Sequence, residues 1–248
     1  MRLPVLALVL FGAATLAAAQ DPSHWDYEGK NGALRWGKLD PAWKACSEGH
    51  EQSPIDIRGA KLNKALPPIE FHYIAGSMTE GNNGHTIQVD VHPGSYIVFE
   101  GVRYDLIEFH FHHPAEEAIK GKLTDMDVHL VHKSADGKLA IVAVRLTEDV
   151  YKPNAVLATL WQTLPAKAGT INKVTELVNP SGLLPVDRGY WTYVGSLSTP
   201  PCTEGVRWLV MEQDMPLSRD QLRAFAALFR INSRGLQDPH GRKIEANE

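Results

Sequence analysis

Two short segments carry histidines at a spacing that could hold a metal ion. Residues 107–112 read IEFHFH, and residues 127–132 read DVHLVH. Residues two apart in a β-strand point to the same face, so His110 and His112 share one face. If the two segments are neighbouring strands, His129 can lie beside them. Three neutral imidazoles that leave a fourth position open suit a catalytic zinc ion, whereas a structural zinc site has four protein ligands.

A carboxylate precedes two of these histidines by two residues. Glu108 stands before His110, and Asp127 stands before His129. Histidines that bind a metal usually donate their other ring N–H to such a group, which fixes the tautomer and the orientation of the ring. The spacing alone leaves the metal open, because a double-stranded β-helix site for iron or manganese can also begin with His-x-His.

Both segments are expected to be strands of a β-rich domain. Alternating apolar and polar residues, separated by turn signals, predict strands over 86–92, 95–100, 107–112, 126–132 and 139–146. One helix is predicted from Pro153, a favoured first helical residue, towards Leu164. A second follows a capping box of Ser218 with Gln221. Since no repeat or linker divides the chain, these elements predict one domain.

The composition is that of a packed globular protein without a nucleic-acid-binding surface. The 248 residues carry a formal charge of −4 and are 44% hydrophobic. The hydrophobic share is ordinary for a globular core. The basic residues are scattered along the chain, so they predict no partner of nucleic acid.

The first 19 residues have the pattern of a secretory signal peptide. Arg2 precedes an apolar run over residues 3–19, and the small residues 17–19 offer a cleavage site. A membrane anchor fits less well, because the run is short and contains Gly12. No later stretch reaches the ~20 apolar residues that a membrane span needs. The sequence therefore predicts a periplasmic or secreted protein comprising residues 20–248.

Cys46 and Cys202 are the only cysteines of the chain. An even number of cysteines in an exported protein predicts a disulfide bond, although two buried free thiols are the alternative. Such a bond closes a long loop and would stabilise the fold by about 4–5 kcal/mol in the chain-entropy description.

The longer motifs of the chain identify a family. They are Trp25-x-Tyr27-x-Gly29, residues 52–57, Asn83-Gly84-His85, residues 109–112, 129–132, 195–202 and 206–208, Asn232, Arg234, Gln237 and Gly241-Arg242. In this order and spacing they resemble the α-class carbonic anhydrases, specifically the exported bacterial branch, over nearly all of residues 20–248. The resemblance implies a central, twisted, mostly antiparallel sheet of about ten strands with a few short peripheral helices. It also implies a Zn²⁺ cofactor, the reversible hydration of CO2 to bicarbonate and a proton by zinc-bound hydroxide, and pairing as a homodimer.

The same resemblance implies a role for individual residues around the metal. His110, His112 and His129 become the zinc ligands. Ser198 and Glu116 become a gatekeeping pair, in which the hydroxyl accepts a hydrogen bond from hydroxide and donates one to the carboxylate. The family usually has threonine in place of Ser198. Serine keeps the hydroxyl but loses the stiffness of a β-branched side chain, so we expect activity with some loss of orientation.

A further histidine is implied as the proton shuttle. His85 follows a turn, and an imidazole with an ordinary pKa near ~6.5 suits proton transfer near neutrality. Tyr27, Asn83 and Gln88 match positions that shape the water chain, although Gln88 replaces a more familiar asparagine.

The substrate pocket follows from the resemblance alone. Thr199 is implied to hold bicarbonate. Apolar residues that would otherwise be assigned to the core are implied to surround CO2; they are Val131, Ile141, Leu197, Val206 and Trp208.

Departures from the family surround the histidines. Glu108 stands where glutamine is usual, and its charge is expected to make His110 a stronger donor. Asp127 stands where glutamate is usual and is one methylene shorter, so its contact with His129 is expected to be less direct or through water. The backbone carbonyl of Asn232 is the expected partner of His112. Glu117 is interpreted as a surface acid, and its difference from the family's usual residue as a structural variation.

Three other classes of protein fit the sequence less well. A non-catalytic carbonic-anhydrase-like binding domain generally lacks a zinc ligand, whereas all three histidines are present; only Ser198 and Glu108 leave room for a weakly active binder. A double-stranded β-helix enzyme would not account for Asn83-Gly84-His85 or for residues 197–202. A zinc store would usually have more cysteine or histidine clusters. No metal role is expected for His24, His50, His72, His92, His113, His132 and His240.

Overall fold

The computed structural model describes residues 24–248, so the expected signal peptide lies outside the described residues. The strands are β1 (Asp56–Ile57), β2 (Lys61–Leu62), β3 (Glu70–His72), β4 (Met78–Asn82), β5 (Ile87–Val91), β6 (Tyr96–Phe99), β7 (Val102–His112), β8 (Ala118–Ile119), β9 (Met126–Ser134), β10 (Leu139–Glu148), β11 (Ile171–Lys173), β12 (Tyr190–Ser196), β13 (Glu204–Met211), β14 (Met215–Leu217) and β15 (Glu245–Ala246). The α-helices are α1 (Trp36–Leu39), α2 (Ala45–Glu48), α3 (Ala155–Leu160) and α4 (Arg219–Ala226). The 3₁₀ helices are η1 (Gly29–Asn31), η2 (Ala33–Arg35), η3 (Pro41–Trp43) and η4 (Pro180–Leu183).

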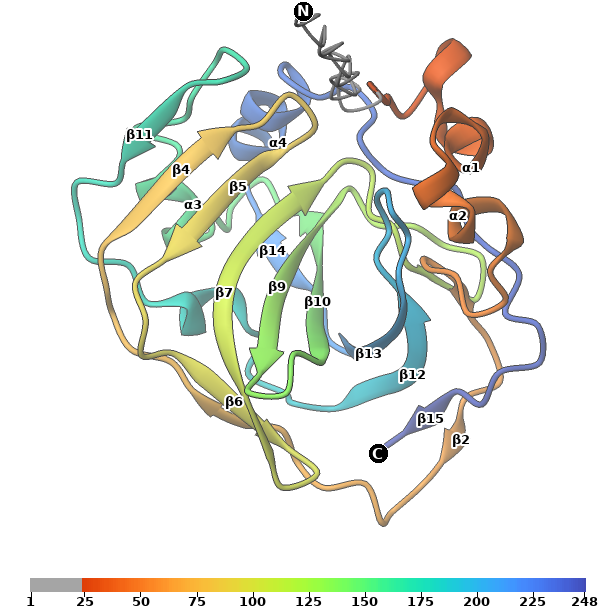
Figure 1. Cartoon of the computed structure of the whole chain (residues 1–248). Coiled ribbons are helices and arrows are strands. Elements are labelled where there is room, and N and C mark those ends of the chain that lie inside the picture. Colours follow the sequence, from red (N-terminus) through yellow and green to blue (C-terminus); the bar gives the residue numbers. More distant parts are fainter. Residues whose placement is uncertain (1–23) are drawn as a thin grey trace, which may run out of the picture.

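One large twisted sheet dominates the molecule (Figure 1). Within the described residues it has 13 strands, and its main path runs β11-β4-β5-β7-β9-β10-β13-β12-β15-β2. Most neighbours are antiparallel; β10 pairs in parallel with β13 and β14, as β15 does with β2. The predicted single, mainly β domain is confirmed, with β1 and β8 forming a separate parallel pair.

The predicted strands all form, and the predicted helices form with different ends. The capping box of Ser218 and Gln221 begins α4. The first helix starts at Ala155 rather than at Pro153 and ends at Leu160. Its N-cap is Asn154, whose side chain accepts hydrogen bonds from the backbone of the first turn. An asparagine cap satisfies free N–H groups of that turn, which proline does not.

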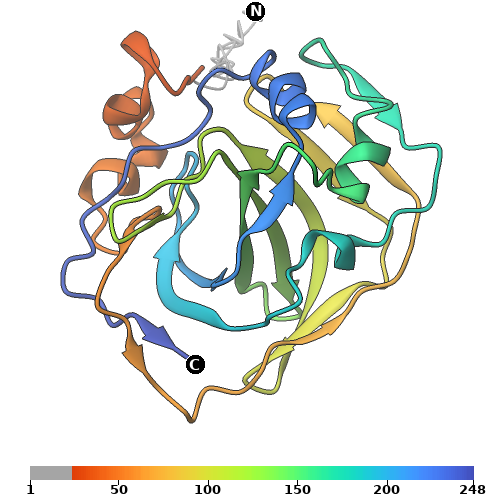
Figure 2. The ribbon, with the colours of Figure 1, turned by 180° about the vertical axis from the view of Figure 1, so that it is seen from behind.

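The main hydrophobic core lies on one face of the sheet, beneath α3 and α4. Seen from behind, the green α3 and the blue α4 lie over this face (Figure 2). Phe109 and Phe111 of β7 are fully buried there, and Phe111 packs against Trp161 and Phe225. Because strand residues alternate, burying these two phenylalanines directs His110 and His112, which alternate with them, to the other face.

A β-bulge in β7 sets this alternation. The register with β9 shifts between Leu106 and Glu108, which leaves Ile107 unpaired. Leu106 and Phe109 both belong to the core, although a regular strand would place them on opposite faces. The bulge therefore places Glu108 on the histidine face.

The predicted disulfide bond is confirmed. Cys46 of α2 is bonded to Cys202, across 156 residues of sequence. It joins the N-terminal helices to the loop that carries Ser198. Beneath it the buried Arg234 donates hydrogen bonds to the Cys46 carbonyl and to Gln52. This end of the chain is thereby fixed against the candidate site.

Candidate metal centre and active site

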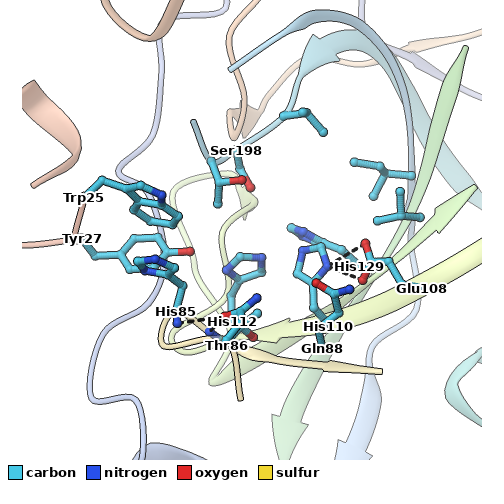
Figure 3. Close-up of a pocket in the computed structure, with 15 residues that line it drawn as sticks. Trp25, Tyr27, His85, Thr86, Gln88, Glu108, His110, His112, His129 and Ser198 are labelled. Atoms are coloured by element: carbon cyan, nitrogen blue, oxygen red, sulfur yellow. Dashed lines mark hydrogen bonds and ion pairs between the residues drawn. The ribbon is translucent and has the colours of Figure 1, made fainter. Parts of the chain in front are cut away.

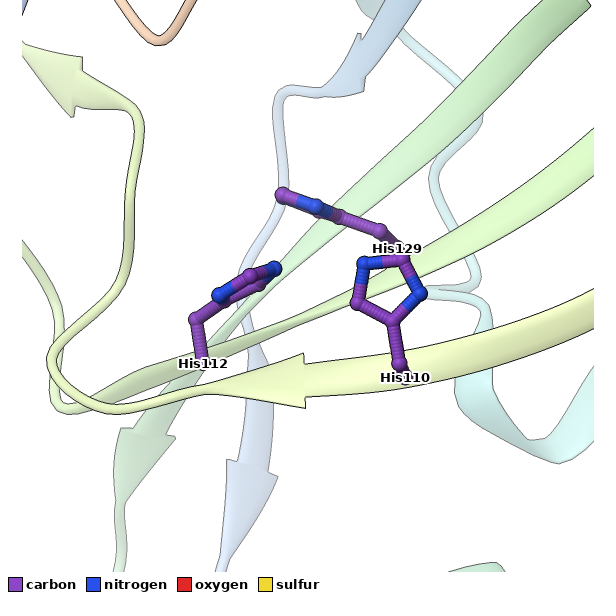
Figure 4. A group of neighbouring side chains, drawn as sticks. All are labelled: His110, His112 and His129. Atoms are coloured by element: carbon purple, nitrogen blue, oxygen red, sulfur yellow. The ribbon is translucent and has the colours of Figure 1, made fainter. Parts of the chain in front are cut away.

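Three histidines from two adjacent strands meet on the face opposite the core (Figure 4). His110 of β7 pairs directly with His129 of β9, and His112 follows two residues along β7. The ring centroids lie 5.0 Å (His110–His112), 5.5 Å (His110–His129) and 4.6 Å (His112–His129) apart. One nitrogen from each ring can be chosen so that all three lie within 4.8 Å of one another. The strand pairing thus brings together the three predicted ligands.

The outer nitrogens of the β7 histidines have the expected partners. Glu108 Oε2 and Oε1 lie 2.9 and 3.1 Å from His110 Nδ1. His112 Nδ1 lies 2.7 Å from the backbone carbonyl of Asn232. Because a carboxylate and a carbonyl only accept, each Nδ1 carries the proton. The Nε2 lone pairs of His110 and His112 are therefore free to bind a metal.

The outer nitrogen of His129 has a second carboxylate beside the expected Asp127. Its Nε2 forms a hydrogen bond with Glu117 Oε2 at 3.4 Å. Asp127 Oδ2 lies at the same distance from Nε2, but it also accepts a 2.7 Å hydrogen bond from the backbone N–H of Glu116. Glu117 is fully buried, so its interpretation as a surface acid is wrong. Residues 115–119 read AEEAI, and this pattern carries no local signal that Glu117 is buried.

The inner nitrogens provide a test of whether a metal fits. His112 Nε2 and His129 Nδ1 are buried and have no hydrogen-bond partner among the described residues. A buried polar atom without a partner is costly, and a bound cation would satisfy both lone pairs. Three imidazole nitrogens with their outer N–H groups held in place are the donor set of a catalytic zinc site, so the residues fit this metal.

The electrostatics of the site favour a cation. Burial holds the pKa of His112 well below its ordinary value, and His129 adds to this effect, so the His112 ring is neutral as a ligand must be. Burial alone would lower the pKa of His129, but Asp127 and Glu117 raise it well above its ordinary value. Negative charge that attracts a proton to this ring also attracts a metal ion.

A cavity of about 190 Å³ opens above the three rings (Figure 3). Its lining includes the predicted substrate residues Val131, Ile141, Leu197 and Thr199 and the predicted proton-path residues Tyr27, Asn83 and Gln88. Val206 and Trp208 do not line it. They are buried behind the wall, where the Trp208 ring packs edge-on against His129 at 5.0 Å. The cavity thus has a histidine floor and a partly apolar wall.

The predicted gatekeeping pair lies beside the cavity. Ser198 lines the cavity, across from the histidines. Glu116 is buried, and its Oε1 accepts a 2.8 Å hydrogen bond from the backbone N–H of Arg234. Its Oε2 has no partner within residues 24–248, so the expected hydrogen bond from Ser198 is not formed. Burial raises the pKa of Glu116 to about 8. A cation at the histidines would favour its ionised form.

The predicted shuttle lies at the rim of the cavity. The half-buried His85 ring stacks on Trp25, with centroids 3.7 Å apart and planes inclined by 6°. Asn83 Oδ1 accepts hydrogen bonds from the backbone of His85 and Thr86, which fixes the turn. Burial lowers the pKa of His85, while Asp26 opposes this shift. The ring therefore remains a proton acceptor at pH values below its ordinary pKa.

Comparisons with known proteins agree with this geometry. The family model described as eukaryotic-type carbonic anhydrase matches residues 31–248. A carbonic anhydrase of Pectobacterium carotovorum is 40% identical over 229 residues, which cover 92% of this chain and 93% of that protein. An α-carbonic anhydrase from Thermovibrio ammonificans, solved with sulfanilamide, superposes with a TM-score of 0.87 at 36% identity, covering 91% of this chain and 100% of that one. A hyperthermostable carbonic anhydrase from a hydrothermal vent chimney gives a TM-score of 0.87 at 41% identity, with the same coverage. This chain belongs to the eukaryotic-type, or α-class, carbonic anhydrase family.

Proposed function

We propose that this protein is an exported zinc enzyme that catalyses the reversible hydration of CO2 to bicarbonate and a proton. The observation that carries the proposal is the convergence of three histidine nitrogens on the floor of a cavity with an apolar wall. The zinc ion would be held by His110 Nε2, His112 Nε2 and His129 Nδ1. When bound, it lowers the pKa of water and so supplies hydroxide as a nucleophile near neutral pH.

The walls of the cavity bind and orient the substrate. Val131, Ile141 and Leu197 present apolar surface, which suits CO2 because the molecule has no net charge or dipole. The Ser198 hydroxyl would accept a hydrogen bond from the attacking oxygen and donate one to Glu116 Oε2, which has no partner among the described residues. That arrangement aligns a lone pair of the nucleophile with the carbon atom. Thr199 lies next to Ser198, where its hydroxyl can hold an oxygen of bicarbonate.

The proton of each turnover leaves through His85. A side chain at the rim can receive a proton from water in the cavity and release it to buffer. Tyr27, Asn83 and Gln88 line the cavity that separates His85 from the metal-binding histidines, so they can order water between them. The stack on Trp25 holds the ring at the mouth.

Export is the second part of the proposal. Residues 1–19 would be removed as a signal peptide, leaving residues 20–248 in the periplasm or outside the cell. The disulfide bond supports this location, because such bonds persist in oxidising compartments. Among residues 24–248, no helix has both the length and the apolar character needed to cross a membrane.

The test is stopped-flow CO2 hydration by residues 20–248 in the oxidised form, with the zinc content measured on the same sample. We expect one zinc ion per chain and rapid hydration. His112→Ala should abolish both. His132→Ala is the matched control, since that buried histidine bonds Tyr73 and not the metal-binding group. Full zinc content without hydration would refute the proposal and favour a binding domain.

A further inference from the structure

We propose that Glu117 is a positioning residue for the zinc site. It holds the outer nitrogen of His129 and links this ring to the segment that carries Ser198. This inference rests on the proposed function, because it concerns the way in which the chain holds the metal. Asp127, two residues before His129, is the partner that the sequence predicts, and the structure gives reasons to assign the larger share to Glu117.

The first reason is the competition for His129 Nε2. Glu117 and Asp127 each place an oxygen 3.4 Å from this nitrogen, and the Glu117 oxygen is the better aligned of the two for a hydrogen bond. Asp127 Oδ2 already accepts the shorter, 2.7 Å bond from the backbone N–H of Glu116. Glu117 Oε2 has no second partner among the described residues. Glu117 is therefore the better-placed acceptor for the N–H of His129.

The second reason is that Glu117 is itself held in place. Its Oε1 accepts a 3.3 Å hydrogen bond from the Tyr193 hydroxyl, which lies 3.2 Å from Ser53 Oγ. Ser53 Oγ in turn accepts the backbone N–H of Ser196 at 3.1 Å. Ser196 is two residues before Ser198. A buried chain of hydrogen bonds thus runs from a metal ligand to the strand end that positions the catalytic hydroxyl.

The packing around this chain of hydrogen bonds leaves little freedom. A Cβ atom at Gly195 would lie 2.2 Å from Ser53 Oγ, and 2.8 and 2.9 Å from atoms of Tyr193 and Trp208. Trp208 is a second connection between His129 and this strand end. Its ring packs on His129, and its indole N–H donates a hydrogen bond to the Ser196 carbonyl at 3.0 Å. Removing Glu117 would take away one of the two supports of the His129 ring. The direction of the His129 Nδ1 lone pair would then change.

The test measures zinc release from the zinc-loaded protein, residues 20–248, into an excess of a strong chelator. Partners of metal-bound histidines typically contribute about 10- to 100-fold in metal affinity. We expect Glu117→Leu to release zinc about 10- to 100-fold faster than the parent. Glu117→Gln, which keeps an oxygen acceptor, should lie between the two. Asp127→Asn should have the smaller effect. Glu80→Leu, which removes another fully buried carboxyl group away from the histidines, is the control and should release zinc at the parent rate.

A spectroscopic measurement separates positioning from a general loss of structure. The visible spectrum of the cobalt-substituted protein reports the ligand geometry, and it should change in Glu117→Leu but not in Glu80→Leu. If Glu117→Leu does not fold, faster zinc release from Glu117→Gln decides the question. The proposal would be overturned if the Glu117 variants released zinc at the parent rate. It would also be overturned if Glu80→Leu released zinc as fast as Glu117→Leu. A parent protein that holds no zinc would instead refute the proposed function itself.

Discussion

Glu80 is a buried carboxyl group outside the site, and its ionisation should cost stability. The side chain lies on β4 and is fully buried. Its Oε1 accepts a 2.6 Å hydrogen bond from Thr163, and its Oε2 has no partner among the described residues. Burial raises the pKa of Glu80 from 4.5 to about 7, with the Thr163 hydrogen bond opposing the rise. The folded state therefore binds this proton more tightly than the unfolded chain does.

The sign and size of the effect follow from this shift. Below pH 4.5 the group is protonated in both states, so it costs nothing. As the pH rises from 4.5 through 7, the unfolded chain loses its proton first, and the folded state loses stability relative to it. A shift of about 2.5 pKa units corresponds to about 3 kcal/mol at ~1.4 kcal/mol per unit. This is a large share of the roughly 5–15 kcal/mol by which domains are stable.

Glu80→Gln isolates this cost, because the amide cannot ionise and its oxygen can still accept from Thr163. Urea unfolding is measured at pH 3.5, where Glu80 is protonated in both states, and at pH 8.5, and the two proteins should have nearly equal stability at the lower pH. At the higher pH the variant should be more stable by about 3 kcal/mol. Groups that titrate in both proteins cancel in the difference. Glu176→Gln, at an exposed position, is the control for replacing a glutamate by glutamine. A difference between parent and Glu80→Gln that does not change with pH would refute the reasoning.

Three further predictions concern catalysis. His85→Ala should lower CO2 hydration by about 100-fold in weak buffer, and added imidazole should restore it; no recovery would count against a shuttle. Because burial lowers the pKa of His85, the parent should retain its buffer-independent rate to a lower pH than an exposed histidine would allow. Glu108→Gln should lower the pH at which hydration is half-maximal, because the bond from His110 to a full negative charge strengthens that ligand. An unchanged midpoint in the pH–rate profile would contradict this role of Glu108.

The elements that position the histidines could be predicted because their signals are local. Alternation in 107–112 and 126–132 predicts two strands, and Ser218 with Gln221 predicts the start of α4. The disulfide followed from an even number of cysteines in a chain expected to be exported. The family resemblance then added the roles of residues, such as Ser198, that have no local signal of their own.

What could not be predicted depends on contacts between distant parts of the chain. The bulge at Ile107 arises from the register between β7 and β9. The burial of Glu117 arises because β8, which follows it directly, pairs with β1 about sixty residues earlier. Tyr193, which holds Glu117, comes from β12. Both β1 and Tyr193 lie too far along the chain from Glu117 for a local sequence pattern to reveal the contact.

The two departures from the family next to His129 are best understood together. Asp127 is one methylene shorter than the usual glutamate, and its oxygen is occupied by the backbone of Glu116. Glu117 supplies a carboxylate from another direction at the same nitrogen.

If the Asp127 side chain is only too short to hold His129, then lengthening it should make Glu117 dispensable. The double variant Asp127→Glu with Glu117→Leu should therefore release zinc more slowly than Glu117→Leu alone, approaching the parent rate. Asp127→Glu alone should leave zinc release near the parent value, because Glu117 already holds the ring. If the double variant releases zinc as fast as Glu117→Leu, reach is not the deficiency, and the link from Glu117 through Tyr193 is what the site requires.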